Sequence, residues 1–254
     1  MHLASLAVTF AVAAFVGCGG AETVPTTTTG GPATPVDPAT AGTITGTVRF
    51  AGTPPTMPTL PLRSIAGCSE QHDGPVYTGD ALVHDGLVEN AFVYVKDGLA
   101  APSFPVPVEP VTIDQRGCLY TPHVVGALTH QAIRFVNDDA VLHNVHGQPA
   151  KSSAWNFGMA VKGSERTVRI DAPEVAVSTR CDVHPWMQAY IGVLDHPYFQ
   201  VTGPDGRFTL HDVPPGDYVV AAWHERFGTR EAKVTLPAKG STDVTLTFAD
   251  GPPR

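Results

Sequence analysis

The segment CDVHPWM at positions 181–187 gathers three side chains that can bind a metal ion. Cys181 supplies a thiol, His184 an imidazole and Met187 a thioether. Thiolate and thioether sulfurs favour Cu(I), whereas imidazoles suit Cu(II), so this mixed set serves both oxidation states of copper. The alternative is coincidence, because a free cysteine is commonly a small buried apolar residue and methionine commonly fills gaps in a core. We predict that the three side chains converge on one copper ion.

A fourth ligand is expected from FVNDDAVLHNVHG at positions 135–147, which contains two histidines. His143 and His146 are three positions apart, so on an extended strand their side chains point to opposite faces. Only one of them can therefore face the loop at 181–187. The strand periodicity alone leaves the choice between them open.

The two segments FVNDDAVLHNV and CDVHPWM, in this order and separation, resemble the cupredoxins, the plastocyanin and azurin family. The short Cys-x2-His-x2-Met loop looks most like that of amicyanin. The resemblance implies one type 1 (blue) copper per chain, with two imidazoles and a thiolate around the metal and a weak axial thioether. The ligands that it implies are His143, Cys181, His184 and Met187.

The same resemblance implies roles for neighbouring residues. Asn144 is expected to hydrogen-bond toward the cysteine loop and steady it. An exposed edge of His184, flanked by Pro185 and Trp186, is expected to be the port through which electrons pass. His146 and Met159 are then interpreted as structural residues. Zinc is the alternative metal, although closed zinc sites use cysteine and histidine without methionine, and the chain has no C-x2-C pair.

The elements that carry these residues are predicted to be strands. From residue 43 onward the apolar residues alternate with polar ones, as where Ile44, Val48 and Phe50 share one face. Asp-Gly and Pro-Pro-Gly turn signals separate many of the later runs. No stretch has a sustained helical period, so we predict an all-β protein built from β-sandwiches.

Two sandwiches are expected. The stretch at 201–225 resembles the second half of a carboxypeptidase regulatory-like domain, a transthyretin-like or immunoglobulin-like sandwich whose first strand has its counterpart at 42–55. We predict one such sandwich from residues 43–100 and 198–250, with a Greek-key cupredoxin sandwich at 101–197 inserted in it or adjacent to it. Chain ends that lie close together make such an insertion feasible. Two or three sandwiches in series are the alternative.

The N-terminal region is predicted to be a targeting segment. Residues 1–17 contain an apolar run too short to span a bilayer. This run ends in FVGC at positions 15–18, which resembles the lipobox of bacterial lipoproteins. Cys18 is then the lipidated residue, and residues 18–42, rich in Thr, Pro and Gly, form a disordered tether. We expect a lipid-anchored protein of the bacterial cell envelope, on its periplasmic or extracellular face. Ordinary secretion with cleavage elsewhere is the alternative.

Cys68 and Cys118 are the cysteines left after Cys18 and Cys181 have been assigned, because the chain has four. In an exported protein such a pair is expected to be oxidised to a disulfide. Two reduced buried cysteines or a second metal site are the alternatives.

Composition and motifs exclude several function classes. The formal net charge of −8 disfavours a nucleic-acid partner. The chain has no nucleophile elbow, Walker loop or dinucleotide fingerprint. Copper nitrite reductases place a histidine before the cysteine ligand, where this chain has Arg180. We therefore predict that the protein is not an enzyme.

The predicted function is one-electron transfer by a membrane-tethered blue copper protein. Its partner is expected to be a redox protein such as a c-type cytochrome or a dehydrogenase. Copper delivery or sequestration is one alternative. A surface module that binds a protein or glycan, with a non-essential copper site, is another.

Overall fold

The structure is a computed structural model that describes residues 36–65, 67–100 and 103–249. The predicted signal peptide, Cys18 and most of the predicted tether lie outside these residues. The last residues of the tether form a turn, in which the Ala41 N–H donates to the Asp37 carbonyl and the Lys239 N–H donates to the Thr40 carbonyl. The predicted tether therefore ends in a turn that is hydrogen-bonded to the folded chain.

The described part of the chain is all-β, which confirms the predicted fold class. It contains strands and two short 3-10 helices, with no α-helix. None of its helices is long and apolar enough to cross a membrane. The elements are β1 (Gly42–Ala51), η1 (Leu62–Ser64), η2 (Ser69–Gln71), β2 (Val83–His84), β3 (Leu87–Val88), β4 (Phe92–Asp97), β5 (Val111–Arg116), β6 (Leu119–Thr121), β7 (Val124–Leu128), β8 (Ile133–Asn137), β9 (His143–Gly147), β10 (Trp155–Met159), β11 (Glu165–Val168), β12 (Glu174–Arg180), β13 (Gln188–Leu194), β14 (Phe199–Val201), β15 (Arg207–Val213), β16 (Gly216–His224), β17 (Gly228–Leu236) and β18 (Ser241–Ala249).

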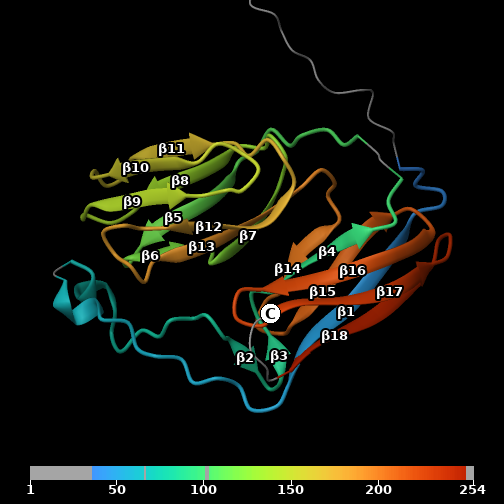
Figure 1. The fold of residues 1–254 in the computed structure, drawn as a ribbon, viewed down its shortest axis with the longest axis horizontal. Helices are drawn as coiled ribbons and strands as arrows, with labels where there is room; N and C mark the ends of the chain where they lie inside the picture. The colour runs from blue at the N-terminus through green and yellow to red at the C-terminus, as the bar shows by residue number, and fades with distance from the viewer. Residues whose placement is uncertain (1–35, 66, 101–102, 250–254) are drawn as a thin grey trace, which may run out of the picture. The chain divides into compact units, whose positions relative to one another are not determined.

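One sandwich joins the two ends of the described chain, and we call it the terminal sandwich. One of its sheets has the order β15-β1-β3-β2, with β18 also paired to β1, and the other has the order β14-β4-β16-β17. Figure 1 shows β1, in blue, beside β18, in red, and the two strands pair in parallel. The predicted inward face of β1 is confirmed, because Ile44, Val48 and Phe50 are buried in one core with residues of β4 and β16.

The second sandwich is built from β5 to β13, and we call it the central sandwich. Its sheets have the orders β10-β9-β12-β13-β7 and β11-β8-β5-β6. Apolar residues of both sheets form one buried cluster, which includes Ile113, Phe135, Val145 and Ile191. Its strands β9, β12 and β13 carry the predicted metal-binding segments.

A long connection between β1 and β2 contains η1 and η2. Within it, Thr59 and Tyr77 form an isolated antiparallel bridge, and we call the described residues from 59 to 77 the cover segment. Leu62 of this segment is buried in the core cluster of the central sandwich, and Leu60, Ile65 and Val76 pack against that cluster. Cys68 of this segment forms a disulfide with Cys118, which lies between β5 and β6. The segment is therefore packed on and covalently linked to the central sandwich.

Candidate metal centre

The loop from Cys181 to Met187 connects β12 to β13. These strands pair antiparallel up to Arg180 and Gln188, so the two ends of the loop are held side by side. The Cys181 N–H donates to the Met187 carbonyl over 3.1 Å, and the Met187 N–H donates to the His184 carbonyl over 2.9 Å. This compact loop brings a thiol, an imidazole and a fully buried thioether side chain together.

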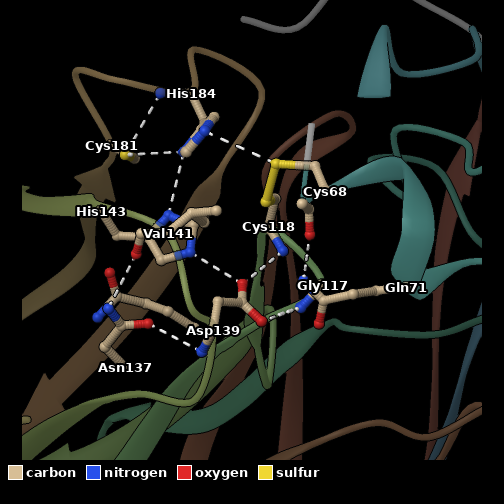
Figure 2. Close-up of polar contacts among 12 residues, drawn as sticks. Cys68, Gln71, Gly117, Cys118, Asn137, Asp139, Val141, His143, Cys181 and His184 are labelled. Atoms are coloured by element: carbon tan, nitrogen blue, oxygen red, sulfur yellow. Dashed lines mark hydrogen bonds and ion pairs between the residues drawn. A yellow bond between two sulfur atoms is a disulfide. The ribbon is translucent and has the colours of Figure 1, made fainter. Parts of the chain in front are cut away.

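His143 is the first residue of β9, which pairs with β12, and its side chain faces the loop. Its Nδ1 lies 3.0 Å from Nδ1 of His184, and Nδ1 of His184 lies 3.7 Å from Sγ of Cys181 (Figure 2). The three ligand atoms all lie within 4.8 Å of one another, and all three residues are buried. Two distant segments of the sequence thus converge on one point.

This arrangement fits a single metal ion. Bonds of about 2.0 Å to nitrogen and about 2.3 Å to sulfur separate two ligand nitrogens by about 3.0–3.5 Å, and a nitrogen from a sulfur by about 3.7 Å. The observed separations of 3.0 Å and 3.7 Å match these values. Two imidazoles and a thiolate, with Met187 in the same loop, form the set of ligand types that suits copper.

Asp139 holds the far side of the His143 ring. Its Oδ2 lies 2.8 Å from Nε2 of His143, and both side chains are fully buried. The N–H groups of Gly117 and Cys118 donate to the carboxylate over 2.8 Å. Burial raises the pKa of Asp139, but the hydrogen bond from His143 and the two backbone N–H groups outweigh it and lower the pKa below the usual range. An ionised Asp139 keeps the proton of His143 on Nε2, which leaves the Nδ1 lone pair free for a metal.

Sγ of Cys181 accepts two backbone hydrogen bonds. The N–H of Asn144 lies 3.3 Å from it and the N–H of His184 lies 3.4 Å from it. Burial raises the pKa of the thiol, but the neighbouring His143 ring and these N–H groups together lower it. The Asn144 side chain also accepts a hydrogen bond from the N–H of Asp182. These hydrogen bonds link the loop to β9. The lowered pKa favours the thiolate form of Cys181.

The predicted exposed edge of His184 is wrong. The residue is only 2 % exposed, and its Nε2 lies 3.7 Å from Sγ of Cys68 (Figure 2). The disulfide between Cys68 and Cys118 therefore lies against the ring. Burial lowers the pKa of His184, and the positive charge of a protonated His143 lowers it further.

His146 and Met159 have hydrogen-bond partners outside the predicted ligand set, although Met159 lies directly opposite His143 on the neighbouring strand. Along β9 the residues alternate between buried and half-buried, with His143 and His146 on opposite faces. Nδ1 of His146 lies 3.0 Å from a carboxylate oxygen of Asp182. Sδ of Met159 accepts a hydrogen bond from the Gln115 side chain over 2.9 Å. Both side chains therefore have partners of their own.

Sequence reasoning missed two features of this centre. One is Asp139, although its position four residues before His143 in FVNDDAVLH was a signal that could have been used. The other is the hydrogen bond of Trp186, whose Nε1–H donates to the Cys118 carbonyl over 2.9 Å while its ring lies against His184. No local sequence pattern predicts that hydrogen bond, because Cys118 lies 68 positions away from Trp186 in the sequence.

No protein-family profile matches the chain, and no curated protein matches its sequence. Solved structures match part of the chain. The reduced form of an amicyanin mutant is 19 % identical, covering 33 % of this chain and 81 % of that chain, with a TM-score of 0.31. A purple cupredoxin from Nitrosopumilus maritimus is 18 % identical, covering 33 % of this chain and 98 % of that chain, with a TM-score of 0.29.

A Cu-containing nitrite reductase (NirK) from Thermus scotoductus SA-01 also matches, at 19 % identity and a TM-score of 0.32. The match covers 40 % of this chain and only 26 % of the reductase. These similar structures are cupredoxin-like, and at such identities the likeness concerns the fold alone. The assignment of copper rests on the donor set and its geometry.

The reductase corrects one prediction. We predicted from the sequence that this protein is not an enzyme. That prediction is wrong, because the structures that match part of this chain include a nitrite reductase, which is an enzyme. The comparisons give no support to the carboxypeptidase regulatory-like resemblance or to lipidation, which stay predictions.

Proposed function

We propose that this protein is a type 1 copper protein that transfers one electron at a time. The observation that carries the proposal is the convergence of one ligand atom each from His143, Cys181 and His184 within 4.8 Å in a buried site. Copper, when bound, supplies the change between Cu(II) and Cu(I). The chain's own residues hold the donors in place, since the thiol, both rings and Met187 are fixed by strands and backbone hydrogen bonds.

The closed character of the site supports electron transfer over copper delivery. His143 and Met187 are 0 % exposed, Cys181 is 1 % exposed and His184 is 2 % exposed. A donor set that is buried and hydrogen-bonded changes little when an electron arrives or leaves. Handing a metal to a partner would instead require the cover segment to move first.

A visible absorption spectrum tests the proposal. Addition of Cu(II) to the wild-type protein should give one bound copper per chain and an intense band from thiolate-to-copper charge transfer. Cys181→Ser should lose this band, because a hydroxyl cannot replace the sulfur donor. Met187→Leu should keep the copper and shift the reduction potential, because only the thioether donor is lost. An unchanged spectrum for Cys181→Ser would reject the proposal.

Nitrite reduction should be assayed in addition to the spectrum, because a copper nitrite reductase is among the similar structures. The copper-loaded protein should be mixed with a chemical reductant and nitrite. Consumption of nitrite that depends on Cys181 would define a reductase, whereas one-electron exchange without such turnover would define a carrier.

The proposed setting is the bacterial cell envelope, with Cys18 as the lipid anchor and a c-type cytochrome or a dehydrogenase as the redox partner. The disulfide between Cys68 and Cys118 supports an oxidising compartment. Cys18→Ala should move the protein from the membrane or detergent phase to the soluble fraction. A wild-type protein that is already soluble after fractionation would reject the anchor.

A further inference from the structure

The ring of His184, the proposed ligand that contacts the cover segment, is almost completely shielded from solvent. His184 is 2 % exposed, and its Nε2 faces Sγ of Cys68 over 3.7 Å. The cover segment cannot swing away easily, because it is linked by the disulfide and because Leu62 is buried in the core of the central sandwich. The other ring, His143, is fully buried and hydrogen-bonded to Asp139. Neither histidine can meet a partner protein directly.

Trp186 connects the buried ring to the surface. Its ring centroid lies 5.3 Å from that of His184, at an angle of 47° between the planes. The indole is partly exposed, and Pro185 beside it is exposed. Its Nε1–H is fixed on the Cys118 carbonyl, so the ring has a defined orientation. An aromatic π-system thus spans the gap between a ligand and the solvent.

The other exposed groups of this region do not offer such a path. Val183 and Leu142 are 42 % and 48 % exposed, and both are saturated side chains. They are neighbours of His143 and His184 in the sequence, and they have no π-electrons. Trp186 is therefore the aromatic group that contacts a proposed ligand ring and also reaches solvent.

We propose that Trp186, and not the edge of His184, is the surface group through which the metal centre exchanges electrons with a redox protein. This inference rests on the proposed copper function. The partner is oxidised by one electron as the centre is reduced by one, or the reverse, and no bond forms or breaks. The partner's own redox group would need to approach the face of the loop at residues 185–186.

Fluorescence tests the contact without any turnover, because the chain has three tryptophans. Trp155→Phe with Trp223→Phe leaves Trp186 as the only tryptophan, and Trp155→Phe with Trp186→Phe leaves Trp223, so that tryptophan fluorescence reports one residue at a time. Titration with Cu(II) should strongly quench the first protein at one equivalent and should quench the second much less. Equal quenching of both would overturn the assignment of Trp186.

Electron exchange tests the role. In copper-loaded protein, Trp186→Leu should slow oxidation by a small outer-sphere oxidant about tenfold or more, which corresponds to about 1.4 kcal/mol of activation free energy. Trp186→Phe should lose much less, and Trp223→Phe is the matched control and should keep the wild-type rate. An intact visible band in each variant shows that the centre is still formed. A Trp186→Leu protein with this band and the wild-type rate would overturn the inference, whereas a wild type without the band would reject the copper function itself.

Discussion

Sγ of Cys68 lies 3.7 Å from Nε2 of His184, so a disulfide covers the side of the ring that faces away from His143. The two residues are 116 positions apart in the sequence. The other half of the disulfide, Cys118, donates its N–H to Asp139, which in turn holds His143. The disulfide therefore contacts His184 directly, and it is connected to His143 through the carboxylate of Asp139.

Replacing each of the two histidines of β9 in turn should show which of them is a copper ligand. His143→Ala removes a donor from the buried centre, so copper should bind weakly or give an altered spectrum. His146→Ala is the matched control, because this side chain lies on the opposite face and pairs with Asp182. Copper titration followed by visible absorption measures both. A blue His143→Ala protein beside a colourless His146→Ala protein would show that the wrong histidine has been assigned.

Asp139→Asn should weaken copper binding by about 10–100-fold, as is typical when the partner of a ligating histidine is lost. The amide carries no charge to fix the proton on Nε2 of His143. Competition with a chelator of known affinity measures the change.

Asp138→Asn is the control for this experiment. Asp138 is the neighbouring acid, but it pairs with Arg116, whose side chain is 68 % exposed. Equal losses of affinity in the two variants would mean that Asp139 acts only through the overall charge.

Removal of the disulfide should destabilise the fold. Cys68→Ala with Cys118→Ala opens a loop with a sequence separation of 50, and the chain-entropy model gives a loss of about 4 kcal/mol for a loop of this size. Chemical denaturation of the metal-free proteins measures the free energy of unfolding. The variant should also release copper to a chelator faster, because the cover over His184 is no longer linked. Unchanged stability together with unchanged release would contradict the proposed role of the cover.

His224 should make stability depend on pH. The residue is 2 % exposed and its ring stacks on Phe227, with centroids 4.4 Å apart. Burial lowers its pKa from 6.5 to about 4, and the charge of His123 contributes in the same direction. The folded state thus resists protonation that the unfolded state accepts. The stability is intact above about pH 6.5 and falls as the pH drops toward 4, by about 3 kcal/mol at 1.36 kcal/mol per pH unit.

Denaturation of wild type and His224→Gln at pH 7 and pH 4.5 measures this effect. The variant has no imidazole to protonate, so its stability should fall less over that range. Parallel losses in the two proteins would show that other groups cause the pH dependence.

The sequence by itself determined the available donors and the local geometry of the strands. Alternation of apolar and polar residues predicted the inward face of β1, and the same period of two places His143 and His146 on opposite faces of β9. These features depend only on neighbouring residues, because the backbone of a strand sends successive side chains to alternate sides. The short loop at 181–187 is local for the same reason.

Tertiary structure alone decided what surrounds the donors. The burial of His184 under Cys68, the hydrogen bond from Cys118 to Asp139 and the hydrogen bond from Trp186 to Cys118 join residues from four separate segments. No local pattern encodes such contacts, because they join residues far apart in the sequence, two of them within the central sandwich and one between it and the cover segment. The expected solvent port at His184 was therefore wrong: exposure is a property of the packed chain, while the sequence of the loop records only which side chains it carries.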